Sequence, residues 1–336
     1  MYKFGIVGCG RIAPKHAENI IKVGKLQAVC DVVPEKAKFL SESYNAIAYY
    51  SIEDLLKNEP EIDIISVCTP NGFHAEHAIK SLQAGKHVLC EKPLCITSAA
   101  AWQMIETEKF SRKSLFVVKS TRYNPLLQRL KQLLENKELG ELFSFQLSCF
   151  WNRPPAYYKD WRGKLFPDGG TLYTQFSHYI DAMLWLFGDV AEVKGFSKNF
   201  AHRAVIEFED SGVAALQMQN GMLGTLNWSV NTYEKNSEIS LTLIAEKGTI
   251  SLGGEFINKI NYQQSAVPFL VQPAYNASND YGFYRGSMSN HSEVYKNLVE
   301  ALQNSNHQFA NVFDGLKTVE AIEKIYKAVA VNHLNK

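Results

Sequence analysis

The stretch Phe4-Gly5-Ile6-Val7-Gly8-Cys9-Gly10-Arg11-Ile12-Ala13 decides the fold of this chain. The apolar residues 4–7 are typical of a buried strand, and residues 15–23 have a helical pattern. Between them, the first glycine permits a tight turn, and the second lets the backbone approach a pyrophosphate. The helix N-terminus offers free N–H groups to phosphates. The stretch therefore predicts a dinucleotide-binding turn, with a purely structural glycine turn as the alternative.

Asp31 ends the next predicted strand, residues 26–31, about 20 residues after Gly10. Its carboxylate can accept hydrogen bonds from a ribose diol and would repel a 2′-phosphate. The residues that follow, 32–34, are Val, Val and Pro, so no basic side chain stands ready for such a phosphate. We therefore predict NAD rather than NADP. The predicted cofactor residues in this part are Gly8, Gly10, Arg11, Ile12 and Asp31.

Strand and helix patterns alternate as far as residue 118. The further strands are expected at 62–68, 86–91 and 114–118, and the helices at 34–43, 52–56, 74–84 and 97–110. Such alternation predicts a parallel sheet with right-handed crossovers. We assign residues 1–121 to a Rossmann NAD-binding domain.

Beyond residue 122 strand patterns follow one another with turns between them. The strands are expected at 142–150, 191–200, 203–208, 213–219, 223–230, 238–245 and 248–252. Helices are expected at 125–136, 169–187, 291–303 and 314–330. Residues 122–336 are thus predicted to form a second α/β domain with an open, mostly antiparallel mixed sheet, and the last helix is a candidate to pack back on the Rossmann domain. Residues 253–288 are expected to be an irregular functional or interface loop.

Composition excludes several classes of protein. The 336 residues carry a net charge of +1 with dispersed Lys and Arg, so neither nucleic acid nor an anionic membrane surface is expected as a partner. No apolar window reaches the roughly 18 residues of a membrane span, and the N-terminus runs straight into a strand without a signal peptide pattern. The six cysteines form no CxxC pair. We expect reduced thiols, a cytoplasmic enzyme and no metal site.

Two further motifs follow strand ends, where open α/β sheets bind ligands. In Cys68-Thr69-Pro70-Asn71, Thr69 and Asn71 are candidate contacts to the nicotinamide side, although Asn71 can equally cap the next helix. His74 on that helix is either a cofactor contact or an ordinary, partly exposed histidine. In Glu91-Lys92-Pro93, Lys92 can hydrogen-bond a substrate hydroxyl and stabilise a developing alkoxide, or it can be a solvated lysine paired with Glu91.

The stretch from Asp168 to Asp181 includes Gly169-Gly170 and a predicted helix. Thr174 and His178 share one face of that helix at i,i+4, and Asp181 follows. A histidine of near-neutral pKa is a suitable base for a hydroxyl proton. The alternative is a histidine of the hydrophobic core.

Together these motifs resemble those of the Gfo/Idh/MocA oxidoreductases. The resemblance covers nearly the whole chain and is strongest in residues 69–74 and 84–94. It implies a Rossmann domain, a second domain whose open sheet commonly forms the oligomer interface (a dimer or tetramer here), and a cis bond before Pro93. It makes Lys92 and His178 the catalytic residues and adds Glu91 to the cofactor residues. Many members carry Asp at the place of Thr174, which cannot act as a base, so the proton must pass to His178, Lys92 or water.

Within the family, a second set of motifs resembles the WlbA/WbpB-type 3-dehydrogenases, which oxidise the 3-hydroxyl of UDP-N-acetylglucosaminuronic acid in bacterial surface-polysaccharide (lipopolysaccharide O-antigen) synthesis. The motifs are Arg122-Tyr123-Asn124-Pro125, Phe150-Trp151-Asn152-Arg153-Pro154, Tyr157-Tyr158, Trp161-Arg162-Gly163 and the stretch 286–291. Aromatic rings can stack on a sugar or uracil, and arginines can bind a carboxylate or diphosphate. Core packing and salt bridges are the alternatives. That branch usually has Asn at the Thr174 place.

The predicted substrate-binding residues are Lys92, Arg122, Tyr123, Asn152, Arg153, Tyr157, Trp161, Arg162, Thr174, His178 and His291. In the mechanism His178 removes the hydroxyl proton while Lys92 polarises the oxygen, or the two roles are reversed. The branch also implies that 2-oxoglutarate re-oxidises NADH. The rivals are another sugar or inositol dehydrogenase of the superfamily and, more remotely, a non-catalytic NAD-binding regulator.

Overall fold

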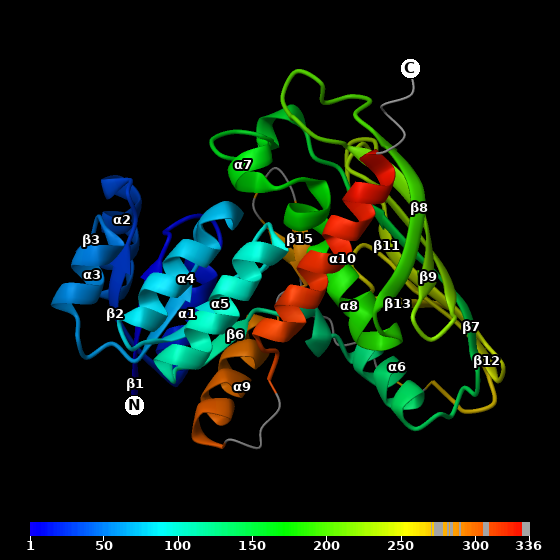
Figure 1. Ribbon diagram of the computed structural model, residues 1–336, viewed down its shortest axis with the longest axis horizontal. Coiled ribbons are helices and arrows are strands. Elements are labelled where there is room, and N and C mark those ends of the chain that lie inside the picture. Colours follow the sequence, from blue (N-terminus) through cyan, green and yellow to red (C-terminus); the bar gives the residue numbers. More distant parts are fainter. Residues whose placement is uncertain are drawn as a thin grey trace. The chain divides into compact units, whose positions relative to one another are not determined.

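The computed structural model describes residues 1–269, 271, 278–280, 282, 285–288, 290–304 and 309–330. The chain forms two compact units (Figure 1). Unit 1 comprises Met1–Lys119 and His291–Val319, and unit 2 comprises Ser120–Asn290 and Glu320–Lys336. We predicted residues 291–319 to be part of the second domain. They fall in the first unit.

Unit 1 is built on a parallel sheet of six strands in the order β3-β2-β1-β4-β5-β6. This is the order of the Rossmann fold, in which the chain changes direction between β1 and β4. The predicted fold class of the N-terminal region is therefore confirmed. The strands are β1 (Tyr2–Val7), β2 (Gly24–Cys30), β3 (Ile47–Tyr49), β4 (Ile64–Val67), β5 (His87–Cys90) and β6 (Leu115–Val117).

The helices of unit 1 are α1 (Ala13–Val23), α2 (Pro34–Tyr44), α3 (Ile52–Asn58), α4 (His74–Gln83), α5 (Ser98–Ser111), α9 (His291–Gln303) and the start of α10 (Val312–Ala330). A 3-10 turn, η1 (Asn71–Phe73), precedes α4. A second 3-10 turn, η2 (Ser120–Tyr123), begins unit 2. Proline in the first turn starts α1 and α2, and the Ser51 hydroxyl caps α3 by accepting from the N–H of Asp54. The strand β3 was missed because it has only three residues, none of them buried.

Unit 2 is built on a seven-stranded sheet in the order β13-β12-β11-β7-β10-β9-β8. Only β7 and β10 run parallel; the other neighbours are antiparallel, which confirms the predicted mixed sheet. Its strands are β7 (Leu142–Phe150), β8 (Val190–Lys198), β9 (Ser211–Met218), β10 (Leu223–Ser229), β11 (Glu238–Ala245), β12 (Gly248–Gly253) and β13 (Lys259–Ser265). A small separate pair joins β14 (Ser278–Asp280) to β15 (Arg285–Met288).

One face of this sheet carries the core of unit 2. The further helical segments are α6 (Pro125–Glu135), η3 (Pro155–Tyr157), α7 (Leu165–Asp168), the π-helical turn η4 (Leu172–Phe176) and α8 (Ser177–Phe187). Phe187 of α8 stacks on Phe145 of β7 with ring centroids 4.9 Å apart. On β9, β10 and β11 buried and more exposed residues alternate, so the opposite face is in part open and bears Phe196 (67% exposed) and Leu223 (58% exposed).

The strand predicted at 203–208 is wrong. Those residues form turns between β8 and β9. The cause is Asp210, whose carboxylate accepts hydrogen bonds from the N–H groups of Phe200, Ala201 and His202. Gathering three successive N–H groups on one carboxylate folds the chain into a loop and takes it out of the sheet.

The irregular loop predicted at 253–288 is also wrong in part, because β13 extends the sheet beyond β12 and β14 pairs with β15. The sequence of β13, Lys-Ile-Asn-Tyr-Gln-Gln-Ser, has little of the apolar alternation that identifies a half-buried strand, since this edge strand is mostly exposed. Residues 270, 272–277, 281, 283, 284 and 289 of that loop lie outside the described residues.

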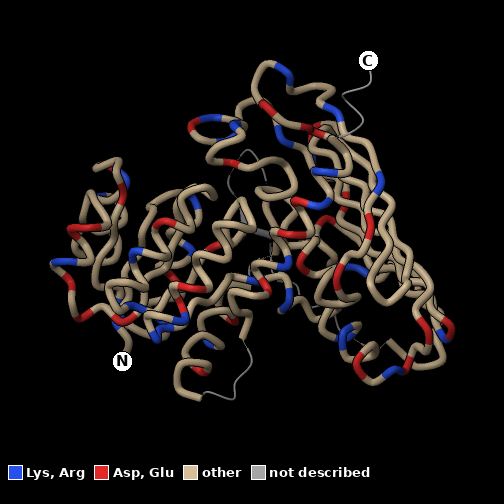
Figure 2. Tube along the Cα trace, in the orientation of Figure 1, with Lys and Arg blue, Asp and Glu red and all other residues tan. Residues whose placement is uncertain are grey.

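Residues of opposite charge are mixed along the chain (Figure 2). Figure 2 shows Lys and Arg interspersed with Asp and Glu along the described parts of both units. None of the helices searched, all within the described residues, combines the length and the apolar character needed to cross a bilayer.

Candidate functional site

The glycine turn of unit 1 lies between the ends of β1 and β4. Gly8 has φ +95°, and a Cβ there would lie 2.6 Å from the backbone of Cys68 and Thr69, so only glycine fits. At Gly10 a Cβ would meet no atom within 4 Å. The second glycine is therefore not required by packing inside the protein and borders open space.

Asp31 lies just past β2 and is bound to the same turn. Its carboxylate accepts from the N–H of Cys9 at 2.8 Å and from the N–H of Val33, also at 2.8 Å. Arg11 and Ile12, both half-buried, precede α1, whose first residue Ala13 is buried against the sheet. The turn thus presents a fixed carboxylate beside a helix N-terminus, as dinucleotide binding requires.

Two histidines hold the motif Cys68-Thr69-Pro70-Asn71, which follows β4. Asn71 is buried in η1, and the Thr69 hydroxyl lies 3.0 Å from Nδ1 of His77. Nδ1 of His74 lies 2.7 Å from the carbonyl oxygen of Pro93, and Nε2 lies 2.7 Å from that of Thr69. Burial lowers the pKa of His74, opposed by these two carbonyls. A neutral ring has one N–H and donates to one of these two carbonyls, and in either case His74 lies between the two strand-end motifs.

Glu91 and Lys92 follow β5, and the Lys92–Pro93 peptide is cis, as the family resemblance implies. Lys92 is half-buried. Its backbone N–H donates to Oε2 of Glu91 at 2.9 Å. Glu91 is buried, so its carboxylate fixes the backbone from which the Lys92 side chain projects.

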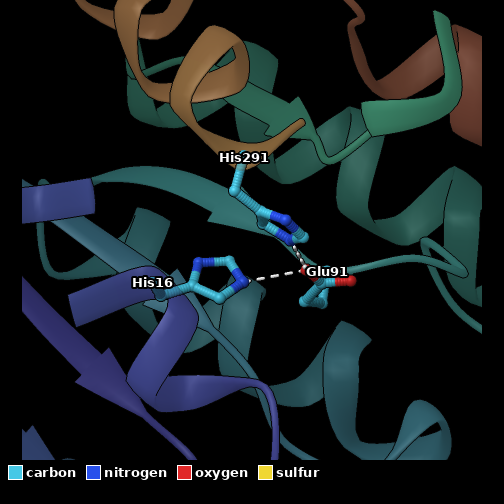
Figure 3. A group of neighbouring side chains, drawn as sticks. All are labelled: His16, Glu91 and His291. Carbon is cyan, nitrogen blue, oxygen red and sulfur yellow. Dashed lines mark hydrogen bonds and ion pairs between the residues drawn. The ribbon is translucent and has the colours of Figure 1, made fainter. Parts of the chain in front are cut away.

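Two histidines converge on the other oxygen of Glu91 (Figure 3). Nε2 of His16 in α1 lies 2.8 Å from Oε1, and Nε2 of His291 at the start of α9 lies 3.3 Å from it. Burial opposes ionisation of Glu91, but the hydrogen bonds from these histidines outweigh it and hold its pKa well below the usual range.

The hydrogen bonds behind His16 fix its tautomer. Nδ1 lies 2.7 Å from the hydroxyl of Tyr295, which lies 2.9 Å from that of Ser66. Burial lowers the pKa of His16, so the ring is neutral and has a single N–H. With Nε2–H donating to the Glu91 carboxylate, Nδ1 accepts from Tyr295 and Tyr295 accepts from Ser66. His16, Glu91 and His291 also have the residue types of a metal site, but these N–H donors account for the short distances between them.

In unit 2, Thr174 lies in the π-helical turn η4 and His178 at the start of α8. His178 is buried, whereas Thr174 is the one residue of 171–184 that is not. π-helical turns inside helices recur at functional sites. Asp181 is committed elsewhere: its carboxylate accepts from Nε of Arg122 at 2.9 Å and from Nη2 at 2.8 Å. The predicted substrate residue Arg122 thus ties η2 to α8 through a two-point ion pair.

The aromatic and arginine motifs of unit 2 form a packed cluster. Arg153 is only 1% exposed and lies over the rings of Trp151 and Tyr157, at 4.6 and 5.3 Å from their centroids. Its Nε donates to Gln175 at 2.6 Å, and Gln175 in turn donates to the hydroxyl of Tyr157. Arg162 lies over Trp161 and Tyr157. Arg153 is thus a buried part of the framework and Arg162 lies nearer the surface.

The remaining predicted substrate residues are dispersed. The side chain of Asn152 donates to the carbonyl of Thr232, and its backbone N–H donates to Oδ1 of Asn236. Tyr123 is half-buried in η2. His291 lies in unit 1 beside Glu91. Lys92 also belongs to unit 1, and His178 belongs to unit 2.

Sequence reasoning missed several buried polar groups. Besides His16, Ser66 and Tyr295, these are Asp168 and Glu209 in unit 2. Glu209 accepts from Nε1 of Trp228 at 3.2 Å and from the hydroxyl of Tyr326 at 3.0 Å, and burial raises its pKa to about 8. A usable signal was the i,i+4 spacing of His291 and Tyr295, which places both on one face of α9.

Comparison with known proteins identifies the family. The model of the Gfo/Idh/MocA oxidoreductase family, with its NAD-binding Rossmann fold, matches residues 2–119, and the model of the family's C-terminal domain matches residues 127–251. The chain belongs to this family. It is accordingly an NAD-dependent oxidoreductase that acts on a sugar hydroxyl.

Several relatives are similar over most of their length. The WlbA dehydrogenase of Bordetella pertussis, solved with NADH and UDP-GlcNAcA, is 32% identical with a TM-score of 0.88, covering 98% of this chain and 97% of that one. The WlbA dehydrogenase of Chromobacterium violaceum, solved with the same two ligands, is 31% identical with a TM-score of 0.88, covering 98% and 94%. The myo-inositol 2-dehydrogenase of Thermotoga maritima is 27% identical over 70% of this chain and 72% of its own.

The residues of this family member fit NAD. Open space at Gly10 accommodates a pyrophosphate next to the start of α1, and Asp31 stands at the end of β2 where a ribose diol is bound in this fold. Val32 beside it is 83% exposed and offers no positive charge to a 2′-phosphate. NAD, when bound here, supplies the acceptor for a hydride from the sugar.

Proposed function

We propose that this chain oxidises the 3-hydroxyl of a UDP-sugar, most specifically UDP-N-acetylglucosaminuronate, in bacterial surface-polysaccharide synthesis. The observation that carries the proposal is the similarity of nearly the whole chain to two WlbA dehydrogenases, each solved with NADH and UDP-GlcNAcA. The aromatic and arginine cluster of unit 2 supports it, because such side chains suit a sugar, a uracil and charged groups.

In the proposed reaction Lys92 donates a hydrogen bond to the hydroxyl oxygen and stabilises negative charge on it as the C–H bond breaks. His178 takes the hydroxyl proton, or the two residues exchange these roles. Glu91 orients Lys92 through the backbone N–H that it accepts. Gly8, Gly10, Arg11, Ile12, Asp31, Thr69 and Asn71 bind the cofactor. Arg162 and Trp161 contact the substrate, together with Tyr123, Asn152, Tyr157, Thr174 and, through their packing, Arg122, Arg153 and His291.

The reaction needs UDP-sugars and NAD, so we place the enzyme in the cytoplasm. We also propose that 2-oxoglutarate re-oxidises the NADH and is itself reduced to 2-hydroxyglutarate.

The half-open face of the unit 2 sheet, with Phe196 and Leu223, is the surface we assign to a second copy of the chain in a dimer or tetramer. An F196D/L223D double variant, analysed by light scattering, is expected to be monomeric.

The substrate is tested by incubating the purified protein with UDP-N-acetylglucosaminuronate, NAD and 2-oxoglutarate. Mass spectrometry should reveal a sugar lighter by two hydrogens, together with 2-hydroxyglutarate. Parallel reactions contain myo-inositol or simple glucosides with NAD. Turnover on those alone would instead favour the second candidate, an inositol or simple sugar dehydrogenase, which the Thermotoga maritima relative supports. Arg162→Ala should impair only a charged substrate.

A further inference from the structure

The position at which many family members carry an aspartate is occupied here by Thr174, but a carboxylate is present one hydrogen bond away. The Thr174 hydroxyl donates to Oδ1 of Asp168, a residue six positions earlier in the chain. Asp168 ends α7, after a cis Phe166–Pro167 peptide, and the two glycines that follow lead the chain into η4.

Asp168 is enclosed and anchored. It is only 1% exposed, and its Oδ2 accepts from the N–H of Gly163 at 2.7 Å. The N–H of Gly170 also bonds to it, and the charged or titratable groups near it are Arg162 and Tyr158. Burial raises the pKa of Asp168 to about 6, with the bonds from Thr174 and Gly163 and the charge of Arg162 opposing the rise. The group is therefore a carboxylate at neutral pH and is lost as an acceptor in mild acid.

Thr174 is placed to touch a ligand because its side chain is not fully enclosed. It alone among residues 171–184 is not buried, and His178 follows it by four residues across the π-helical turn. The hydroxyl hydrogen of Thr174 points to Asp168, so the hydroxyl group can meet any other polar group only through the lone pairs of its oxygen. An oxygen in that state can accept a hydrogen bond but cannot donate one.

We propose that Asp168 and Thr174 act as one unit, a carboxylate-backed hydroxyl that accepts the hydrogen bond of a substrate hydroxyl next to His178. The inference rests on the proposed role of His178. Thr174 contacts the substrate, and Asp168 is a positioning residue that acts through it. A threonine thereby replaces the family's aspartate without loss of a negative group behind the site.

The test compares four variants on whichever sugar the wild-type protein oxidises. Thr174→Ser keeps the hydroxyl and should retain kcat within about twofold. Thr174→Val keeps the shape and Asp168→Asn keeps the size; each should lower kcat/KM by about tenfold or more, as expected for a charge-assisted hydrogen bond. Because both act through one contact, the double variant should be no worse than Thr174→Val alone.

The pH profile separates this role from a structural one. Wild type and Thr174→Ser should lose kcat/KM in acid with an apparent pKa near 6, the value for Asp168. In Thr174→Val and Asp168→Asn the component due to Asp168 should be absent, which leaves only the acid limb of the proposed base His178. A purely structural contact would lower the melting temperature but leave kcat/KM and its pH profile unchanged, and that result would overturn the proposal. If the wild-type protein oxidises a sugar other than UDP-N-acetylglucosaminuronate, the proposed substrate is wrong, but this test still applies. All four variants are compared on the one sugar that the wild type oxidises.

Discussion

Glu91 in unit 1 and Glu209 in unit 2 are the same residue type, both buried, yet they are held in opposite states. Glu91 receives N–H groups from His16, His291 and the backbone of Lys92. Glu209 receives the Trp228 indole and the Tyr326 hydroxyl on Oε1, with further hydrogen bonds from its own backbone and from Thr171. Burial raises the pKa of both, but the donors reverse this at Glu91 and do not at Glu209, where the pKa stays near 8.

The difference shows that burial alone does not decide ionisation; the kind of donor does. Two histidines and a backbone N–H hold an anion next to Lys92, where the proposed chemistry needs a rigid backbone. Without a histidine among its donors, Glu209 remains a neutral acid at pH 7, and it joins Tyr326 of α10 to the start of η4, since Tyr326 also accepts from the N–H of Leu172.

The largest effects should come from the two proposed catalytic residues, one in each region. Lys92→Ala and His178→Ala are each expected to lower kcat by about 10²- to 10⁴-fold, the range for groups that move or polarise a proton. Hydride transfer is followed by NADH absorbance at 340 nm. Lys194→Ala, at an exposed position, is the control. Full NADH formation by either variant would show that the replaced residue is not catalytic.

The two glutamates are compared directly by converting each to glutamine. Glu91→Gln loses the charge that strengthens three hydrogen bonds and is expected to lower the free energy of unfolding by about 3 kcal/mol at pH 7. Glu209→Gln replaces a neutral acid by a neutral amide and should change it by less than about 1 kcal/mol. Urea unfolding measures both values. Equal losses would show that the two carboxyl groups are not in different states.

The pH dependence of stability should show the same contrast. The pKa of Glu209 is raised on folding from 4.5 to about 8, so the folded state binds the extra proton between these values. Its contribution to stability is present below pH 4.5 and is lost as the pH rises to 8, at up to about 1.4 kcal/mol per pH unit. Wild type should therefore lose stability relative to Glu209→Gln over this window. A flat difference between the two proteins would contradict the raised pKa.

Asp31 is a third carboxylate at a strand end, half-buried and bound by two backbone N–H groups. Asp31→Ala should weaken NAD binding by about tenfold through loss of the ribose contact. It should also reduce the ratio of NAD affinity to NADP affinity, because the carboxylate that repels a 2′-phosphate is removed. Calorimetric titration with each cofactor checks this. Val32→Ala, which removes an exposed side chain next to it, is the matched control.

The first unit could be predicted from sequence because its site residues follow strand ends. Gly8, Thr69 and Lys92 are placed by strand topology, which the pattern of apolar residues reveals. Tyr295, by contrast, meets His16 from a position 279 residues along the chain, and no local pattern encodes that pairing. The role of Asp168 could not be predicted, because it depends on a hydrogen bond with Thr174 that the π-helical turn makes possible.

The wrong strand has a local cause as well. Residues 203–208 have a strand-like apolar pattern, yet the carboxylate of Asp210 competes for the N–H groups ahead of them. The burial of Arg153 could not be predicted either, because sequence does not reveal that its side chain is enclosed by Trp151, Tyr157 and Gln175.

The hydrogen-bond chain from Ser66 through Tyr295 and His16 is polarised in a single sense, toward Glu91. The histidine N–H groups hold the pKa of Glu91 well below its usual range, so the group at the end of this chain is an anion at neutral pH. Oxidised nicotinamide carries a positive charge that its reduced form lacks. A coenzyme bound near this anion would therefore be favoured in its oxidised form, the state that begins the reaction.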